Sequence, residues 1–187
     1  MFTLVVLGTI PAGLVGVLFE EQIEAFFGNA LLVGVALLVT GCVLFATRWS
    51  RPRGDGIESV SAAKALLIGV AQAVAIVPGI SRSGTTISTA LLGGVDRETA
   101  ARFSFLLSIP AILGATLLQA REIADAGATV GWLPLAAGFA GSFVVGYAAL
   151  RLLLAFVRRG RLHWFAWYCW LIGAAALAAI WLGRLHG

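Results

Sequence analysis

The chain has 187 residues, of which 60% are hydrophobic and only 12% are charged, and its mean hydropathy is +0.97. This composition lies outside the range of soluble domains and predicts a polytopic helical membrane protein. The net charge of +4 does not indicate nucleic-acid binding, because most of the 13 lysines and arginines fall between apolar segments, where they orient a membrane protein. Cys42 and Cys169 lie inside apolar runs without a Cys or His at ligand spacing, so neither a disulfide framework nor a metal site is expected there.

Residues 2–18 form the first apolar segment, which Pro11 interrupts as a kink that a membrane helix can tolerate. Residues 19–28 then mix acidic and apolar side chains, a pattern typical of an amphipathic turn at a membrane interface. The acidic residues are Glu20, Glu21 and Glu24. We interpret these glutamates as a solvated face rather than as a catalytic pair.

The run at 30–47 is long enough to span a bilayer, and the basic segment after it predicts that this end is cytoplasmic. The basic residues are Arg48, Arg51 and Arg53. The composition at Pro52, Gly54 and Asp55 predicts a loop, and Ser61 is placed to cap the next helix.

The next apolar run, residues 65–77, is about thirteen residues long, which is shorter than the roughly twenty that a spanning helix needs. It stops at Pro78 and Gly79, and after a polar loop residues 83–92 supply a second short helix. Residues 62–94 are therefore predicted to form a re-entrant hairpin, which dips into the membrane and returns on the same side.

Three further spans are expected over residues 100–118, 132–156 and 163–182. Asp96 is a candidate N-cap for the first of them. The second is rich in small residues whose spacing predicts close contact with another helix. These residues are Gly138, Gly141, Ser142 and Gly146.

The predicted fold class is an all-α polytopic membrane protein, with a single membrane domain over residues 1–187, about five transmembrane helices and one re-entrant helical hairpin. Basic residues concentrate at 48–64 and 158–161, so these loops are expected in the cytoplasm and those at 20–29 and 121–130 outside. On this orientation the hairpin enters from the cytoplasmic side, and its polar tip can be reached from outside.

The polar stretch within this hairpin is the first candidate functional site. An always-charged Arg82 at bilayer depth is costly, so it is expected to have an ion, a substrate or a structural partner. We interpret it as an electrostatic clamp for phosphate, with a structural ion pair or a capped carbonyl as the alternative. Ser81 and Ser83 are the candidate catalytic hydroxyls beside it. The candidate substrate-binding residues are Gly79, Gly84, Thr85, Thr86 and Gln72.

The candidate polar side chains also have structural interpretations. A threonine hydroxyl in a membrane helix commonly bonds a backbone carbonyl one turn earlier, so Thr85 and Thr86 could serve either role. Gln72 could hold a phosphate or form a hydrogen bond between helices. Ser104 could reach the hairpin from the next span, or simply pack there.

These residues closely resemble the second half of the bacterial undecaprenyl-diphosphate phosphatase family. The resemblance rests on Pro-Gly-x-Ser-Arg-Ser-Gly at 78–84, on Gly69 and Gln72 before it, and on Phe-Ser-Phe-Leu-Leu-x-x-Pro at 103–110. It extends from Leu-Gly-x-Ile-Pro at 7–11 to the aromatic final helix. The resemblance implies hydrolysis of undecaprenyl diphosphate, which regenerates the lipid carrier for peptidoglycan, and a link to bacitracin resistance.

The family that the chain resembles is an inverted repeat, in which each half contributes one re-entrant hairpin. Its first-half motif, a glutamate-bearing helix leading into Pro-x-Ser-Ser-x-Gly-His, is absent here, and His163 and His186 match nothing in it. The resemblance implies a divalent cation, Mg²⁺ or Ca²⁺, whose ligands are not expected in this chain. We therefore expect either a fragment that is truncated at its N-terminal side or a natural short member.

Two functions follow from the sequence. The first is a multi-pass phosphatase of the bacterial plasma membrane that hydrolyses undecaprenyl diphosphate, with its active site facing the external side. The alternative is a non-catalytic protein that binds or transports polyprenyl phosphates. The expected partners are the polyprenyl diphosphate and membrane lipid, without nucleic acid, and whether the chain forms a homodimer is left open.

Overall fold

The computed structural model describes residues 1–51, 56–125 and 131–185, which form eight α-helices and three short 3-10 helices. The predictions made for Pro52, Arg53, Gly54, Asp55, His186 and the end of the loop at 121–130 lie outside the described residues. The α-helices are α1 (Phe2–Leu18), α2 (Glu20–Phe27), α3 (Ala30–Ala46), α4 (Ala62–Val74), α5 (Arg82–Leu92), α6 (Arg97–Asp125), α7 (Trp132–Arg158) and α8 (Phe165–Leu185). The 3-10 helices are η1 (Thr47–Trp49), η2 (Ile57–Ser59) and η3 (Leu162–Trp164).

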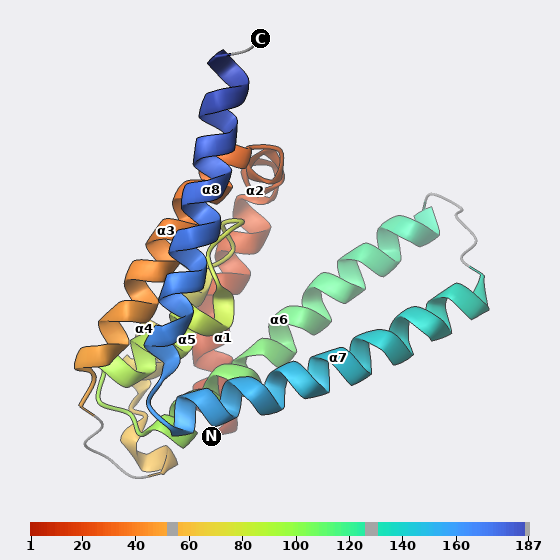
Figure 1. Cartoon of the computed structure of the whole chain (residues 1–187). Helices are drawn as coiled ribbons and strands as arrows, with labels where there is room; N and C mark the ends of the chain where they lie inside the picture. Colours follow the sequence, from red (N-terminus) through yellow and green to blue (C-terminus); the bar gives the residue numbers. More distant parts are fainter. Residues whose placement is uncertain (52–55, 126–130, 186–187) are drawn as a thin grey trace.

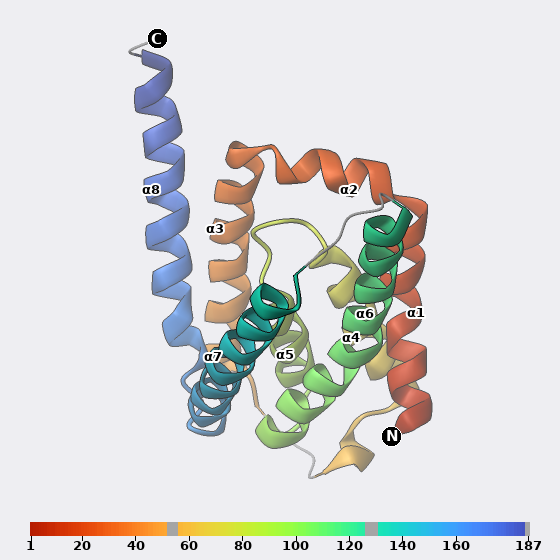
Figure 2. The same ribbon diagram turned by 90° about the vertical axis from the view of Figure 1, so that its right-hand side faces the viewer.

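The prediction of an all-α polytopic membrane protein is confirmed. Within the described residues, four helices are long and apolar enough to cross a membrane, namely α3 with η1, α6, α7 and α8 with η3. Helices α1 and α2 would supply a fifth span if they are counted together, although the chain bends by 79° between them. Figure 2 shows that α2 lies across one end of the bundle, from α1 to α3, as an interfacial helix would.

The bundle is built around the short helices α4 and α5. Figures 1 and 2 show the axes of α1, α3 and α8 lying roughly parallel, with α3 antiparallel to the other two and with α4 and α5 between α1 and α3. Helix α3 packs mainly on α8, and α1 packs mainly on α4. Helices α6 and α7 form a separate pair that leaves the bundle at an angle (Figure 1). The buried hydrophobic core is formed mainly by α4, α5 and the start of α6, with contributions from α3, the end of α7, η3 and the start of α8.

Glycines allow the two main helix pairs to approach closely. A Cβ added to Gly69 in α4 would lie 2.2 Å from the backbone oxygen of Gly8 in α1. A Cβ added to Gly173 in α8 would lie 2.9 Å from the carbonyl oxygen of Gly34 in α3. At both places a larger residue would force the backbones apart.

The small residues of α7 do not make the close contact that their spacing predicted. Nothing in the described chain lies within 4 Å of a Cβ built on Gly138, Gly141 or Gly146. The reason is that α7 lies at the outside of the molecule, where only 6% of its membrane-spanning stretch is buried. Spacing identifies a surface that can be approached closely, but it does not say which helix approaches it.

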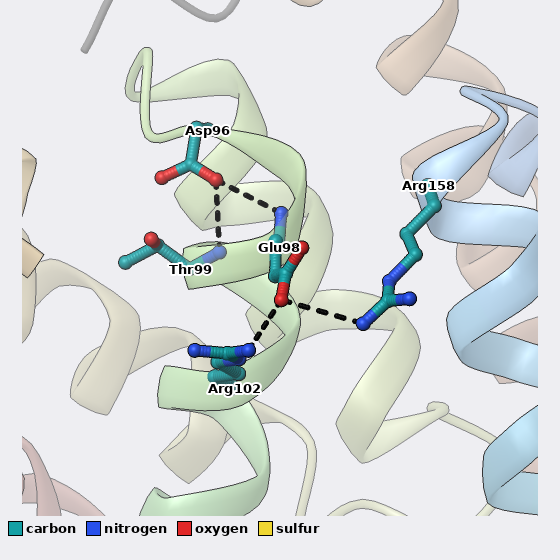
Figure 3. A network of polar contacts seen from close by, with 5 residues as sticks. All are labelled: Asp96, Glu98, Thr99, Arg102 and Arg158. Atoms are coloured by element: carbon teal, nitrogen blue, oxygen red, sulfur yellow. Dashed lines mark hydrogen bonds and ion pairs between the residues drawn. The ribbon is translucent and has the colours of Figure 1, made fainter. Parts of the chain in front are cut away.

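Helix α6 begins with the cap that was predicted. Oδ1 of Asp96 accepts hydrogen bonds from the backbone N–H groups of Glu98 and Thr99, each at 3.0 Å (Figure 3). The side chain of Glu98 accepts from Arg102 on its own helix and, at 3.3 Å, from Arg158 at the end of α7. These exposed ion pairs stabilise the protein by only about 0–1 kcal/mol, so they orient the two helix ends more than they hold them together.

Candidate functional site

The central hairpin consists of two helices that are both too short to span a bilayer. Helix α4 has 13 residues and begins at the predicted N-cap Ser61, whose side chain accepts from the N–H of Lys64 at 3.3 Å. Helix α5 has 11 residues, and its N-cap Ser81 accepts from the N–H of Gly84 at 3.1 Å. The loop at 75–81 joins them and points toward the end of the bundle that α2 crosses (Figure 2).

The tip of the hairpin is held against α3 by one buried hydroxyl. Oγ1 of Thr40 donates to the carbonyl oxygen of Gly79 at 3.0 Å and accepts from the N–H of Ser81 at 3.1 Å. Gly79 has a φ of +92°, and an added Cβ would lie 2.6 Å from the carbonyl oxygen of Val33. Only glycine fits this conformation and this contact. The loop that leads into Arg82 is therefore fixed in place rather than free.

Thr40 was not among the residues predicted from the sequence. It lies in the apolar run at 30–47, and its side chain is only 1% exposed. A polar side chain in the middle of an apolar span was the available signal, because such a group must find a hydrogen-bond partner in the protein. Its partners lie about forty positions later in the chain, so the sequence alone did not reveal them.

Arg82 is half-buried at the start of α5 and is oriented by two neutral acceptors. Its Nη2 donates to Oε1 of Gln72 and, at 2.9 Å, to the carbonyl oxygen of Leu107 in α6. Leu107 lies three residues before Pro110, and the carbonyl that Pro110 leaves without a helical N–H partner is that of the preceding residue, Leu106.

The charge of Arg82 is not neutralised within the described residues, none of which places a carboxylate at ion-pair distance from it. Both of its hydrogen bonds to the described chain leave from Nη2. The guanidinium therefore has Nη1 and Nε available for another acceptor. Among the residues that the structure describes, the structural ion pair weighed as an alternative is not formed, whereas the contact with a backbone carbonyl is.

The side chain of Gln72 gives a second indication that a hydrogen-bond acceptor is absent from the site. The residue is only 2% exposed, yet its Nε2 has no hydrogen-bond partner in the described chain. A buried amide donor without a partner costs about 1–3 kcal/mol, so it is rarely left that way without a reason. Because its Oε1 already accepts from Arg82, the unpaired N–H groups lie beside the guanidinium.

A cavity of about 590 Å³ opens beside these two side chains, between α1, α2, the hairpin and α6. Its polar lining residues are Arg82, Gln72, Thr9, Glu20 and Glu24. The rest of its wall is small or apolar, for example Ala12, Gly13 and Gly16 of α1 and Pro110, Gly114 and Ala115 of α6. The cavity thus combines an apolar wall with a few polar groups, as ligand sites commonly do.

The interpretation of the α2 glutamates as a solvated face was incomplete. Glu20 and Glu24 are exposed, but both also line the cavity that contains Arg82, whereas Glu21 does not. Residues four apart share one helix face, and the bend at Phe19 lays that face over the cavity. The Glu-x-x-x-Glu spacing was visible in the sequence, but the bend that aims it was not.

The other predicted site residues do not line this cavity. Ser81 is occupied as an N-cap, and Gly79 and Gly84 shape the loop and the first turn of α5. Thr86 is fully buried, and its hydroxyl donates to the carbonyl oxygen of Arg82 at 2.9 Å and contacts the hydroxyl of Ser104. Thr85 is buried, with an Oγ1 that has no partner in the described chain, and Ser83 is partly exposed beside Arg82.

The resemblance implied a divalent cation, and the described side chains can be checked for groups that could bind one. Within the described residues, no group of three or more His, Cys, Asp and Glu side chains could hold a metal ion. Two carboxylates line the cavity, and Mg²⁺ is commonly held by one or two carboxylates together with phosphate oxygens of a substrate. Among the described residues, the two carboxylates that line the cavity do not form a metal cage of their own.

The fold and the site define a polytopic helical membrane protein with an arginine at the tip of a helical hairpin. A family model described as Bacitracin resistance protein BacA matches residues 1–175, and the chain belongs to this family. The family expected from the motif at 78–84 is confirmed by this match.

Three relatives, each named Undecaprenyl-diphosphatase, show what share of a related protein's length the chain covers. The one from Desulfatibacillum aliphaticivorans is 48% identical over 96% of this chain and 64% of its own length. The one from Korarchaeum cryptofilum is 42% identical over 94% of this chain and 65% of its own length. The one from Methanothermobacter thermautotrophicus is 48% identical over 94% of this chain and 98% of its own length. The chain thus spans just under two thirds of the first two relatives and almost all of the third.

Proposed function

We propose that this protein hydrolyses undecaprenyl diphosphate to undecaprenyl phosphate and inorganic phosphate. The observation that carries the proposal is Arg82, an arginine with available donors and no carboxylate partner in the described chain, which lines an apolar-walled cavity. The names of the relatives support the same activity, including that of a relative of similar length. Recycling of the lipid carrier for cell-wall synthesis is the biological role that this activity would serve.

The cavity offers separate places for the head group and for the lipid chain. The diphosphate binds through Nη1 and Nε of Arg82, which lack other partners in the described chain, beside the buried Nε2 of Gln72. The first prenyl units lie against the small residues of α1 and α6, and the rest of the chain extends into the bilayer.

The hydrolysis needs groups that stabilise charge on the transferred phosphate. A water oxygen bonds to the terminal phosphorus while the bridging P–O bond breaks; the bridging oxygen leaves with the electron pair as part of the lipid monophosphate, and the attacking water gives up a proton to solvent. Negative charge spreads over the equatorial oxygens in this step, and a fixed guanidinium stabilises it more in the transition state than in the ground state. Arg82 is held for this role by Gln72 and by the carbonyl of Leu107.

We also propose the plasma membrane as the location, with the cavity facing the external side. The arginines at the ends of α3 and α7 and at the start of α6 gather at the end of the bundle from which the hairpin enters (Figure 1). The glutamates of α2 lie at the opposite end. This distribution of charge favours a cytoplasmic base of the hairpin.

The test is the release of inorganic phosphate from undecaprenyl diphosphate by the purified 187-residue chain in detergent or proteoliposomes. Turnover above a protein-free control supports the phosphatase. If the chain binds the lipid but releases no phosphate, the phosphatase proposal fails and the alternative, a polyprenyl-phosphate binder or transporter, is favoured.

A further inference from the structure

The membrane helices contain two kinds of glycine, which differ in what a side chain at that position would meet. At Gly69 an added Cβ would lie 2.2 Å from the backbone oxygen of Gly8, so packing requires glycine there. At Gly13 and Gly16 in α1 and at Gly114 in α6, nothing in the described chain lies within 4 Å of an added Cβ. Packing within the described chain therefore does not require glycine at these three positions.

These three residues, the cavity glycines, all line the cavity that contains Arg82. Gly13 and Gly16 lie three residues apart and so share one face of α1, whereas Gly114 belongs to the wall that α6 forms. Figure 1 shows α6 diverging from α1 toward the end of the bundle that α2 crosses. Glycine is less stable than alanine inside a helix, so the cavity glycines weaken both helices and widen the space between them.

A buried polar side chain indicates independently that this space holds a ligand. Gln72 lines the same cavity and is only 2% exposed, yet its Nε2 has no hydrogen-bond partner in the described chain. Arg82, beside it, favours an anionic acceptor. A single ligand that reaches from these donors to the cavity glycines has an anionic head group and an apolar chain.

The shape of the apolar wall distinguishes one kind of chain from another. A straight alkyl chain has a uniform width and needs no gaps in the wall that holds it. A prenyl chain carries a methyl branch on each of its units, and burying each branch favours binding where the wall leaves room for it. A glycine in place of an alanine leaves a gap of the size of one methyl group, because only the Cβ is missing.

We propose that Gly13, Gly16 and Gly114 are specificity-determining residues, which accommodate the methyl branches of a prenyl chain next to its phosphorylated head group. The identity of the head group as a diphosphate rests on the proposed function. The preference for a branched chain rests on the cavity and on the three glycines in its wall.

Binding of two short analogues tests this preference without turnover. Farnesyl and dodecyl diphosphate have main chains of equal length, but only the farnesyl chain has methyl branches and double bonds. Their methylene-bridged forms, in which a CH₂ group replaces the bridging oxygen and prevents hydrolysis, are titrated calorimetrically into the chain in lipid nanodiscs. We expect the farnesyl analogue to bind roughly fivefold more tightly or better. Equal affinities, or binding of neither analogue, would overturn the proposal.

Alanine variants show whether the cavity glycines cause the preference. Gly13→Ala, Gly16→Ala and Gly114→Ala should each weaken binding of the farnesyl analogue roughly threefold or more and leave the dodecyl analogue unaffected, and the triple variant should lose the preference. Gly141→Ala is the matched control, because its new methyl group also meets nothing within 4 Å in the described chain but lies outside this cavity. An unchanged preference in the triple variant, or an equal loss in Gly141→Ala, would contradict the assignment.

Two further measurements separate the failure of this proposal from other failures. The variants should unfold at temperatures no lower than that of the unmodified chain, since alanine has the higher helix propensity, so weaker binding would not reflect a damaged fold. If the glycines set the preference but the chain releases no phosphate from undecaprenyl diphosphate, the specificity proposal stands and the phosphatase proposal fails. If phosphate is released and the triple variant keeps the preference, the phosphatase stands and the specificity proposal fails.

Discussion

Nη2 of Arg82 donates a hydrogen bond to Oε1 of Gln72, ten residues earlier in the chain, and this bond joins the two short helices of the hairpin beside the cavity. The same nitrogen donates to the carbonyl oxygen of Leu107 in α6. Both acceptors are neutral, so the guanidinium is fixed in orientation while its charge is retained. A fixed guanidinium that keeps its charge is suited to bind a diphosphate, because no reorganisation is needed when the ligand arrives.

Replacing Gln72 by glutamate should impair the recognition of diphosphate. Gln72→Glu keeps the size of the side chain but places a carboxylate against Arg82, which would neutralise the guanidinium and remove the Nε2 donor. We expect KM for undecaprenyl diphosphate to rise roughly tenfold or more, since a partly buried ion pair competes with the ligand. Gln119→Glu, which adds the same charge at an exposed position of α6, should leave KM unchanged. An unchanged KM in Gln72→Glu would mean that this side chain does not support the site.

Removing the hydroxyl of Thr40 should loosen the tip of the hairpin. Thr40→Val keeps the shape of the side chain but leaves the carbonyl of Gly79 and the N–H of Ser81 without their partner. We expect a loss of about 1–3 kcal/mol in the free energy of unfolding, together with lower phosphate release. Thermal unfolding in detergent measures the first quantity. Thr116→Val, at an exposed threonine of α6, is the control and should change neither quantity. An equal effect in both variants would show that the hydroxyl of Thr40 does not hold the hairpin tip.

The contact between α1 and α4 should not tolerate a methyl group. In Gly69→Ala the new Cβ would lie 2.2 Å from the backbone oxygen of Gly8, so one helix must move. We expect a destabilisation of about 1–3 kcal/mol, seen as a lower unfolding temperature. In Gly138→Ala nothing in the described chain lies within 4 Å of the new methyl group, and stability should be kept or slightly raised by the higher helix propensity of alanine. Similar losses in both variants would show that α7 is also closely packed.

The cap of α6 should make stability depend on pH in the acid range. Burial alone would raise the pKa of Asp96, but hydrogen bonds from Thr99 and Glu98 outweigh it and lower the pKa below its ordinary value. The cap therefore stabilises the fold fully above the unfolded pKa of about 3.9, and this contribution is lost as the pH falls further through the folded pKa.

The matched variant for this cap is Asp96→Asn, which can still accept the N–H groups but does not titrate. We expect the unfolding temperature of the unmodified chain to fall toward that of Asp96→Asn as the pH is lowered from 6 to 3. A constant difference between the two proteins over this range would exclude a role for the ionised carboxylate.

The sequence was sufficient to predict the features that depend on local chemistry. The apolar run at 65–77 is too short to span, and Pro78 and Gly79 end it, so a hairpin was expected and two short helices are found there. Ser61 and Asp96 were predicted as caps because their hydroxyl and carboxylate precede helical runs, and both accept the expected N–H groups.

The features that depend on distant contacts could not be predicted in this way. The partners of Thr40 lie 39 and 41 residues later, and no local pattern connects them. Glu20 and Glu24 were interpreted as part of a solvent-exposed helix face. Their position at the cavity could not be predicted, because it depends on the 79° bend between α1 and α2. For the same reason, the small residues of α7 indicated a contact surface without indicating that α7 lies at the outside of the molecule.

The central claim is that Arg82 binds the diphosphate in the cavity and stabilises its hydrolysis. The most direct measurement compares lipid binding and phosphate release from undecaprenyl diphosphate in Arg82→Ala, Arg82→Lys and the exposed control Arg102→Ala. We predict that both Arg82 variants lower kcat/KM by roughly 100-fold or more, because lysine keeps the charge but not the two-pronged geometry, and that the control is unaffected. Full affinity and full turnover in Arg82→Ala would contradict this account.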